Sequence, residues 1–146
     1  MNDLVRGATL EDLDSILELL NQLTSLKDGT IFNREKVENI YRKILDDENY
    51  SLCVYQDEGK ILGTALLLVQ MNISQGGRPY SHIENVVVDK GCRGKGAGKK
   101  MIDYLVDKAK GIDCYKILLN CGKDNITFYE KCGFFDSGEV EMRLAN

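Results

Sequence analysis

Hydrophobic residues in the first third of the chain recur at the spacing of two amphipathic helices. A run of apolar positions from Leu10 to Leu23 begins after Thr9, which stands three residues before Asp12, the separation of a capping box. A second apolar run, from Val37 to Leu45, follows Asn33, a residue type that favours the start of a helix. The pattern therefore predicts two helices joined by a polar turn.

The middle of the chain has the composition of β-strands. Residues 50–55 and 61–71 are rich in aliphatic, aromatic and β-branched side chains, and the stretch between them, residues 57–60, favours a hairpin turn. These residues predict a pair of antiparallel strands. The β-branched run from Ile83 to Val88 predicts a central strand that is buried on both faces.

The second half of the chain predicts a strand, a glycine-rich loop and a helix, followed by shorter elements. The helix carries an apolar stripe from Met101 to Ala109, and it connects Ile83–Val88 to the next strand, so we expect a right-handed connection between parallel strands. The other predicted elements are a strand at Cys114–Leu119, a short helix at Ile126–Cys132 and a terminal strand or hairpin at Phe134–Leu144. The chain is thus expected to have a mixed α+β fold.

The loop between Lys90 and Lys100 has the chemistry of an anion site. Unpaired amides at the start of a helix point outward, and the helix dipole favours negative charge. The glycines of this loop let a phosphate approach closely, while Arg93, Lys95 and Lys99 add positive charge, which predicts a ligand that carries a pyrophosphate. The spacing matches neither a Walker loop nor the G-x-G-x-x-G fingerprint of dinucleotide-binding proteins.

Composition limits the remaining classes of protein. The chain has 146 residues, a net charge of -4 and 43% hydrophobic residues, which fits a single domain over residues 1–146. The sequence has neither a membrane-spanning run nor an apolar leader, so we expect a cytoplasmic protein without a membrane partner. The negative net charge, and a basic cluster without aromatic residues, argue against nucleic-acid binding.

Metal binding and disulfide bonds are not expected either. His82 is the single histidine of the sequence, and its five cysteines include no C-x-x-C pair. A zinc site would therefore need cysteines at unsuitable spacings. Reduced thiols and no metal are the simplest interpretation.

Two motifs in the second half occur together in one enzyme family. The pattern R-x-x-G-x-G at residues 93–98 follows the predicted strand at residues 83–88, and N-x-x-F-Y at residues 125–129 leads into Gly-Phe at residues 133–134. This combination resembles the GNAT superfamily of acetyl-CoA-dependent N-acetyltransferases. The resemblance implies a mostly antiparallel, twisted sheet that is splayed in the middle and has helices on both faces.

The resemblance also implies where acetyl-CoA, the co-substrate, would bind. In this family the loop amides bind the pyrophosphate, and the preceding strand and a later helix bind the pantetheine arm and the thioester. The corresponding residues of this sequence are Val86, Val87, Val88, Arg93, Gly94, Lys95, Gly96, Ala97, Gly98, Lys99, Asn125 and Phe128. An amide in the valine run would stabilise negative charge on the thioester oxygen.

Two residues are the candidates for proton transfer that the resemblance implies. Tyr129 would donate a proton to the departing thiolate, because coenzyme A leaves as a base that benefits from a nearby donor. Glu84 would accept a proton from the amine, directly or through water. The amine would attack the thioester directly, with both substrates bound and without a covalent enzyme intermediate.

The acceptor site resembles one subfamily but departs from it. The chain is similar to eukaryotic glucosamine-6-phosphate N-acetyltransferases, in which the positions of Thr24, Glu84 and Arg143 hold the sugar phosphate. Asn85 and Asn120 are substrate-binding candidates that stand where acidic residues are expected, and residues 72–75 lack an expected basic stretch. An amide cannot accept a proton from an ammonium group, and a missing lysine removes a contact with phosphate.

These departures leave several hypotheses open. We expect the chain to acetylate a primary amine of a small molecule, with glucosamine 6-phosphate as the alternative acceptor. A non-catalytic sensor that binds acyl-CoA is a second alternative. Related amino-sugar enzymes build the acceptor site across two chains, so the resemblance also implies a homodimer.

Overall fold

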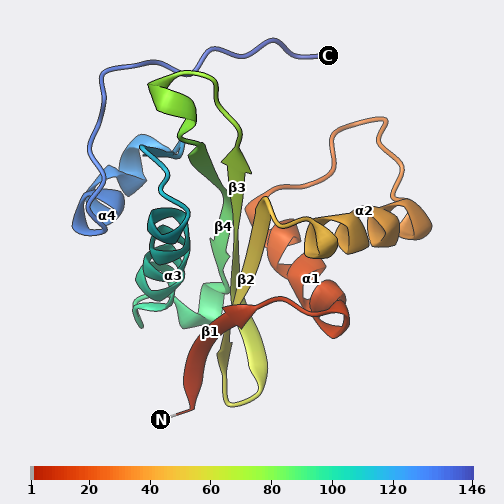
Figure 1. Cartoon of the computed structure of the whole chain (residues 1–146). Coiled ribbons are helices and arrows are strands. Elements are labelled where there is room, and N and C mark those ends of the chain that lie inside the picture. The colour runs from red at the N-terminus through yellow and green to blue at the C-terminus, as the bar shows by residue number, and fades with distance from the viewer. Residues whose placement is uncertain (1) are drawn as a thin grey trace.

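A computed structural model describes residues 2–146 of the chain. Its strands form one sheet in the order β1-β2-β3-β4-β5, so each strand lies beside its neighbour in sequence (Figure 1). The strands are β1 (Asp3–Gly7), β2 (Tyr50–Asp57), β3 (Lys60–Gln70), β4 (Tyr80–Val88) and β5 (Ile117–Leu118). The first four strands pair antiparallel and β5 is parallel to β4, which confirms the predicted mixed fold and its mostly antiparallel sheet.

The α-helices cover both faces of the sheet, as the family resemblance implies. They are α1 (Leu13–Leu23), α2 (Arg34–Asp46), α3 (Ala97–Gly111) and α4 (Ile126–Lys131). Figure 1 shows α1 and α2 on one side of the sheet and α3 and α4 on the other. Short 3-10 turns occupy residues 10–12, 75–77, 90–92 and 123–125.

Helix α3 supplies the centre of the larger hydrophobic cluster. Its side chains Met101, Ile102 and Leu105 are fully buried in the same cluster as Ala65 and Leu67 of β3. A smaller cluster on the other face of the sheet joins α1, α2 and β2. The central strand β3 is therefore covered from both sides, and it anchors the two halves of the molecule.

The starts of α1 and α2 are fixed by the predicted capping residues. Asp12 accepts a hydrogen bond from the amide of Thr9 at 2.8 Å, and Arg6 of β1 donates to its two carboxylate oxygens at 2.7 and 3.0 Å. These bonds from Arg6 lower the pKa of Asp12, whose side chain is only 7% exposed. Asn33 caps α2 by accepting a bond from the amide of Lys36 at 3.1 Å. Asp12 thus ties α1 to the first strand.

Three predictions about the second half were wrong. β4 is the fourth strand of the sheet rather than a central strand buried on both faces, and its residues Glu84 and Asn85 are exposed. The strand predicted at Cys114–Leu119 is reduced to the two residues of β5. Residues 134–144 contain no strand.

The shortened β5 and the missing terminal strand have one physical cause. A strand persists only where a neighbouring strand satisfies its backbone groups, and the chain leaves β4 after Leu118 to form the turn before α4. The terminal segment then runs along the outside of the molecule (Figure 1). Its alternating apolar side chains Val140, Met142 and Leu144 are 82%, 91% and 96% exposed.

Candidate active site

The open edge of β4 is the main feature of this half of the sheet. β4 pairs with β5 only through Ser81 with Ile117 and His82 with Leu118. From Ile83 to Val88, the edge of β4 that faces β5 has no strand beside it among residues 2–146. Its backbone donors and acceptors are therefore available to a ligand. The three valines predicted to contact the coenzyme lie on this edge.

A β-bulge interrupts the ladder between β3 and β4, within the stretch of β4 whose other edge is open. The register between β3 and β4 shifts between Thr64 and Leu66, so that Asn85 and Val86 stand opposite a single residue of β3. Asn85 has a φ of 55°, in the left-handed region that asparagine tolerates better than most residues. A bulge turns peptide groups away from the regular ladder. The bulge therefore leaves backbone groups near Asn85 and Val86 outside the regular β3–β4 pairing, where a ligand can reach them.

The glycine-rich loop connects the end of β4 to α3. Gly94 and Gly96 have φ values of 87° and 81°, and a Cβ atom at either position would meet no other atom within 4 Å. Gly96 is the N-cap of α3, and no side chain among the described residues caps this helix. The first amides of α3 are therefore free for an external acceptor. The structure brings the loop candidates, residues 93–99, together beside the open strand edge.

Fewer basic side chains of the loop are free to bind an anion than the sequence suggests. Lys99 donates to Asp103 at 2.7 Å, which raises the pKa of Lys99, and Lys100 is paired with Asp3 of β1. Arg93 and Lys95 are exposed and form no ion pair within the described part of the chain. Lys90 is likewise exposed and unpaired in this range, so Lys90, Arg93 and Lys95 are the basic side chains available to an anion.

Gly98 has a packing role that the sequence motif does not reveal. A Cβ atom at Gly98 would lie 3.0 Å from Cζ of Phe128. Glycine therefore allows the aromatic ring of α4 to approach the first turn of α3. This contact places Phe128 at the junction of the two helices, while Asn125 ends the turn that precedes α4 and is exposed.

Tyr129 lies in an aromatic cluster on α4. Its ring makes edge contacts with Phe128 and Phe134, at centroid distances of 4.9 and 6.1 Å. Burial raises the pKa of Tyr129, and the neighbouring thiols of Cys121 and Cys132 act in the same direction. A raised pKa keeps the phenol protonated, which is the form that can donate a proton.

Gln22 is a positioning residue whose contacts sequence reasoning missed. Its side-chain amide donates to Asp89 at 2.8 Å, and its carbonyl oxygen accepts from the amide of Lys90 at 3.1 Å. The bond from Gln22 lowers the pKa of Asp89, which also accepts from the amide of Gly91 at 3.1 Å. α1 is thereby fastened to the start of the glycine-rich loop. A polar residue near the end of an amphipathic helix was the available signal, but its partner could not be read from spacing.

The candidates for the acceptor site are only partly brought together. Glu84 and Asn85 are consecutive at the bulge, and Asn120 follows β5 by two residues, so these three flank the opening between β4 and β5. Thr24 directly follows α1 and is exposed. Arg143 lies in the terminal segment, where it pairs with Glu141 at 2.7 Å and is 78% exposed. No contact with the site is present for Arg143 within residues 2–146.

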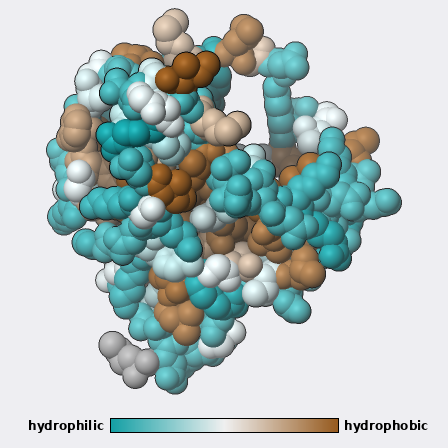
Figure 2. Space-filling view, in the orientation of Figure 1, coloured by the Kyte–Doolittle hydropathy of each residue, from teal (hydrophilic) through white to brown (hydrophobic). Residues whose placement is uncertain are grey.

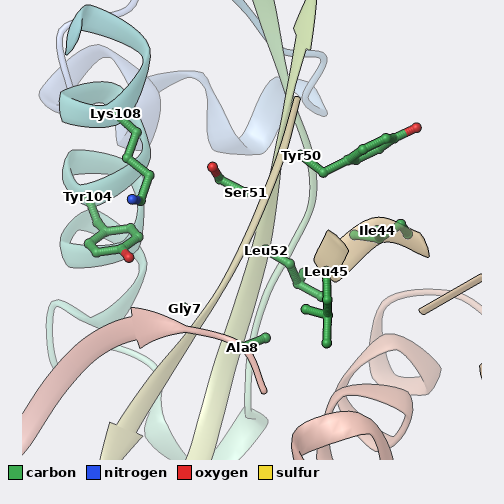
Figure 3. Close-up of a pocket in the computed structure, with 9 residues that line it drawn as sticks. All are labelled: Gly7, Ala8, Ile44, Leu45, Tyr50, Ser51, Leu52, Tyr104 and Lys108. Carbon is green, nitrogen blue, oxygen red and sulfur yellow. The ribbon is translucent and has the colours of Figure 1, made fainter. Parts of the chain in front are cut away.

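The cavities differ in their relation to the site. A cavity of about 180 Å³ lies where β1 ends, between β2 and the ends of α2 and α3, and is lined in part by Ser51, Tyr104 and Lys108 (Figure 3). It lies away from the bulge and the loop. A second cavity, of about 150 Å³, lies under α1 and α2 and reaches Asn85.

Residues 2–146 contain neither a metal-binding cluster nor a membrane-spanning helix. No group of three or more His, Cys, Asp or Glu side chains is arranged to hold a metal ion in this range. Over the same range, no helix combines the length and the apolar character that crossing a membrane requires.

Comparison with known proteins gives a consistent result. Residues 13–134 match the Acetyltransferase (GNAT) family. A glucosamine 6-phosphate N-acetyltransferase of Arabidopsis thaliana is 39% identical over 122 residues, which cover 80% of this chain and 78% of that protein. The enzyme of the same name from Trypanosoma brucei brucei is 36% identical over 139 residues, which cover 91% of this chain and 88% of the relative.

Comparison of the fold with solved structures agrees with the comparison of sequences. The crystal structure of the glucosamine-6-phosphate N-acetyltransferase from Arabidopsis thaliana superposes with a TM-score of 0.89 and 32% identity, over 99% of each chain. The similarity thus extends to both halves of the sheet and to the helices on both faces.

The loop geometry predicts a selective effect of a charged residue at Gly96. We expect Gly96→Glu to weaken coenzyme A binding at least tenfold, because a carboxylate would stand beside the amides and cations that face the phosphates. Binding is measured by titration calorimetry. Gly29→Glu is the matched control, since Gly29 has a φ of 83° and equally open surroundings but lies between α1 and α2. Equal affinities of the Gly96 variant and the wild type would refute the placement.

Proposed function

This chain belongs to the GNAT acetyltransferase family and is an acetyl-CoA-dependent N-acetyltransferase, and from this premise we propose that its acceptor is glucosamine 6-phosphate. The observation that carries the proposal is the similarity to enzymes of that name over most of the chain. A primary amine on a small molecule, which the sequence already indicates, is the broader form of the same proposal.

The residues of the site fit acetyl-CoA. The open edge of β4 offers backbone groups to an extended amide-containing arm, and the uncapped start of α3 offers amides to a pyrophosphate. Gly94 and Gly96 leave the space that such an approach needs, and Arg93 and Lys95 supply positive charge. When bound, acetyl-CoA supplies the activated acyl group, and the protein holds it beside the bulge.

The catalytic contribution of the chain is positioning together with two proton transfers. Glu84 accepts the proton that the acceptor amine must lose, because it is an exposed carboxylate beside the bulge. An amide that follows Asn85 donates to the thioester oxygen as negative charge develops there. Tyr129 donates its proton to the departing sulfur. The C–S bond of the thioester breaks as the C–N bond of the amide forms. Glu84 acts on the attacking amine and Tyr129 acts on the departing sulfur.

A second candidate acceptor is a different small primary amine. Asn85 and Asn120 flank the opening between β4 and β5, and neither side chain can take a proton from an ammonium group. An acceptor that needs fewer carboxylate contacts than an amino sugar phosphate would suit these amides. Polyamines, amino acids and aminoglycosides are therefore the acceptors to test beside glucosamine 6-phosphate.

We also propose that the chain forms a homodimer through its terminal segment. Val140, Met142 and Leu144 alternate with Glu139 and the charged residues that follow, which is the pattern of a half-buried strand. All three apolar side chains are exposed, and within the same chain the segment is held at its end by Lys27, which donates to the carbonyl of Asn146 at 2.8 Å. Such a segment can bury its apolar side chains by pairing with a sheet edge of a second copy of the chain. Arg143 would then belong to an acceptor site shared by two chains.

The proposed acceptor is tested by thiol release from acetyl-CoA across a panel of amines. Glucosamine 6-phosphate is expected to have the highest kcat/KM, and Asn85→Asp or Asn120→Asp should raise that value about tenfold by restoring a charged hydrogen bond. Asn49→Asp, in the turn before β2, is the control that should change nothing. A tenfold preference for another amine would support the second candidate. No release with any amine would favour a binding-only protein.

Tyr129→Phe tests the proton donor. The variant keeps the aromatic contacts but loses the hydroxyl, so we expect kcat to fall about a hundredfold while the affinity for coenzyme A stays within twofold. Tyr104→Phe on α3 is the control. Because burial raises the pKa of Tyr129, loss of the wild-type rate through ionisation of this group should begin at a higher pH than for an ordinary tyrosine. An unchanged kcat in the variant would remove Tyr129 from the mechanism.

The homodimer is tested by light scattering after gel filtration. The wild type is expected to have twice the mass of one chain, and the double variant Val140→Lys and Met142→Lys should have the mass of a monomer and a higher KM for the amine. Glu139→Lys changes a polar position of the same segment and should leave the dimer intact. A monomeric wild type at micromolar concentration would contradict the proposal.

A further inference from the structure

The helices on the two faces of the sheet are held in place by separate hydrophobic clusters. α1 belongs to the smaller cluster, and α3, which begins at the glycine-rich loop, belongs to the larger one. Figure 2 shows hydrophobic residues gathered between these two halves of the molecule. Hydrophobic packing has no preferred direction. Hydrogen bonds between the two halves therefore fix their relative position more closely than the packing does.

Gln22 joins the two halves with both polar groups of its side chain. Its amide nitrogen donates to the carboxylate of Asp89 at 2.8 Å, and its oxygen accepts from the backbone amide of Lys90 at 3.1 Å. Within residues 2–146, these are the only hydrogen bonds that join α1 to the loop. Gln22 and Asp89 are both half-buried, which limits competition from water. The two bonds together fix the distance between the end of α1 and the loop.

On the side of the loop, Asp89 holds the first turn. Its carboxylate also accepts from the amide of Gly91 at 3.1 Å, and its carbonyl oxygen accepts from the amide of Cys92 at 2.9 Å. The bond from Gln22 is the largest cause that lowers the pKa of Asp89, and the positive charge of Arg93 acts in the same direction. Asp89 thus lies near one of the side chains available to an anion. The position of Gln22 therefore determines where the chain enters the segment that is proposed to bind the pyrophosphate.

On the side of α1, Gln22 lies two residues before Thr24, a candidate for the acceptor site. The amide of Thr24 donates to the carbonyl of Leu20 at 2.9 Å, so Thr24 is attached to the last turn of the helix. Residues 25–33, which follow, contain neither a helix nor a strand. The bonds of Gln22 therefore also fix the end of the helix to which Thr24 is attached.

We propose that Gln22 is a positioning residue for both substrates: its side chain holds the loop where coenzyme A binds and the end of α1 where the acceptor binds. The inference rests on the proposed function and adds a residue that contacts neither substrate. Transfer requires the amine and the thioester to be held in a fixed geometry. A residue that sets the distance between the two binding segments therefore affects the binding of each substrate.

A change of charge at Gln22 tests this role. Gln22→Glu places a carboxylate against Asp89 and removes the donated hydrogen bond, so the affinity for coenzyme A should fall about tenfold and KM for glucosamine 6-phosphate should rise about tenfold. The affinity is measured by titration calorimetry and KM by thiol release. Asn21→Asp is the matched control, because it adds the same charge at the neighbouring exposed position of α1. This control should change neither value by more than about twofold.

The double variant Gln22→Glu with Asp89→Asn distinguishes a positioning role from a general loss of stability. The new asparagine donates to the new carboxylate while its oxygen keeps the bond from Gly91, and the carboxylate still accepts from the amide of Lys90. Each single substitution should impair the binding of both substrates, whereas the double variant should return both values to within about threefold of the wild type. A variant that is merely less stable would not be restored by a second substitution.

Three results would overturn the proposal. They are an unchanged affinity for coenzyme A in Gln22→Glu, a change in the binding of only one substrate, and a double variant that does not restore both values. Absence of thiol release with glucosamine 6-phosphate in the wild type would contradict the proposed acceptor instead. The role of Gln22 is then decided by calorimetry with coenzyme A and by hydrogen exchange of the Thr24 amide. This exchange should be faster in Gln22→Glu and return to the wild-type rate in the double variant, and an unchanged exchange rate in Gln22→Glu would again overturn the proposal.

Discussion

The separation of β4 from β5 after two paired residues is the constraint on which the rest of the site depends. A sheet edge with unpaired backbone groups is normally covered or blunted. Here the bulge at Asn85 interrupts the pairing of β4 with β3, and the glycine-rich loop begins where β4 ends. A ligand that pairs with the edge can therefore place its anionic end on the amides of α3 without a change in the fold.

Much of this arrangement could be predicted because its causes are local. The capping residues of α1 and α2, the hairpin between β2 and β3 and the stripe of α3 all follow from short-range periodicity. The failures concern pairing. Nothing in the run from Cys114 to Leu119 indicates that only two residues find a partner, and the exposed terminal segment has a strand pattern without a strand. Contacts between residues far apart in the chain, such as Gln22 with Asp89, likewise could not be predicted from the spacing of residues in the sequence.

The basic loop shows how pairing refines a prediction made from composition. Its lysines suggest a broad positive patch, yet Asp103 and Asp3 engage Lys99 and Lys100. The charge left for a phosphate belongs to Lys90, Arg93 and Lys95, in the loop that leads to the uncapped amides of α3. Positive φ at Gly94 and Gly96 then matters more than the number of basic residues, because it determines where those amides point.

Asn85 links the donor and acceptor halves of the site, and its chemistry suits its surroundings. Its backbone forms the bulge, and its side chain borders a cavity whose other walls are hydrocarbon or carry hydroxyls bonded elsewhere. An ionised carboxylate at this position would stand beside an apolar cavity at a cost in solvation, whereas a neutral amide costs less. The asparagine that departs from the amino-sugar enzymes is therefore compatible with the apolar cavity next to it. An amide at position 85 cannot accept a proton, so the proposed mechanism gives that task to Glu84, which precedes it on the exposed part of β4.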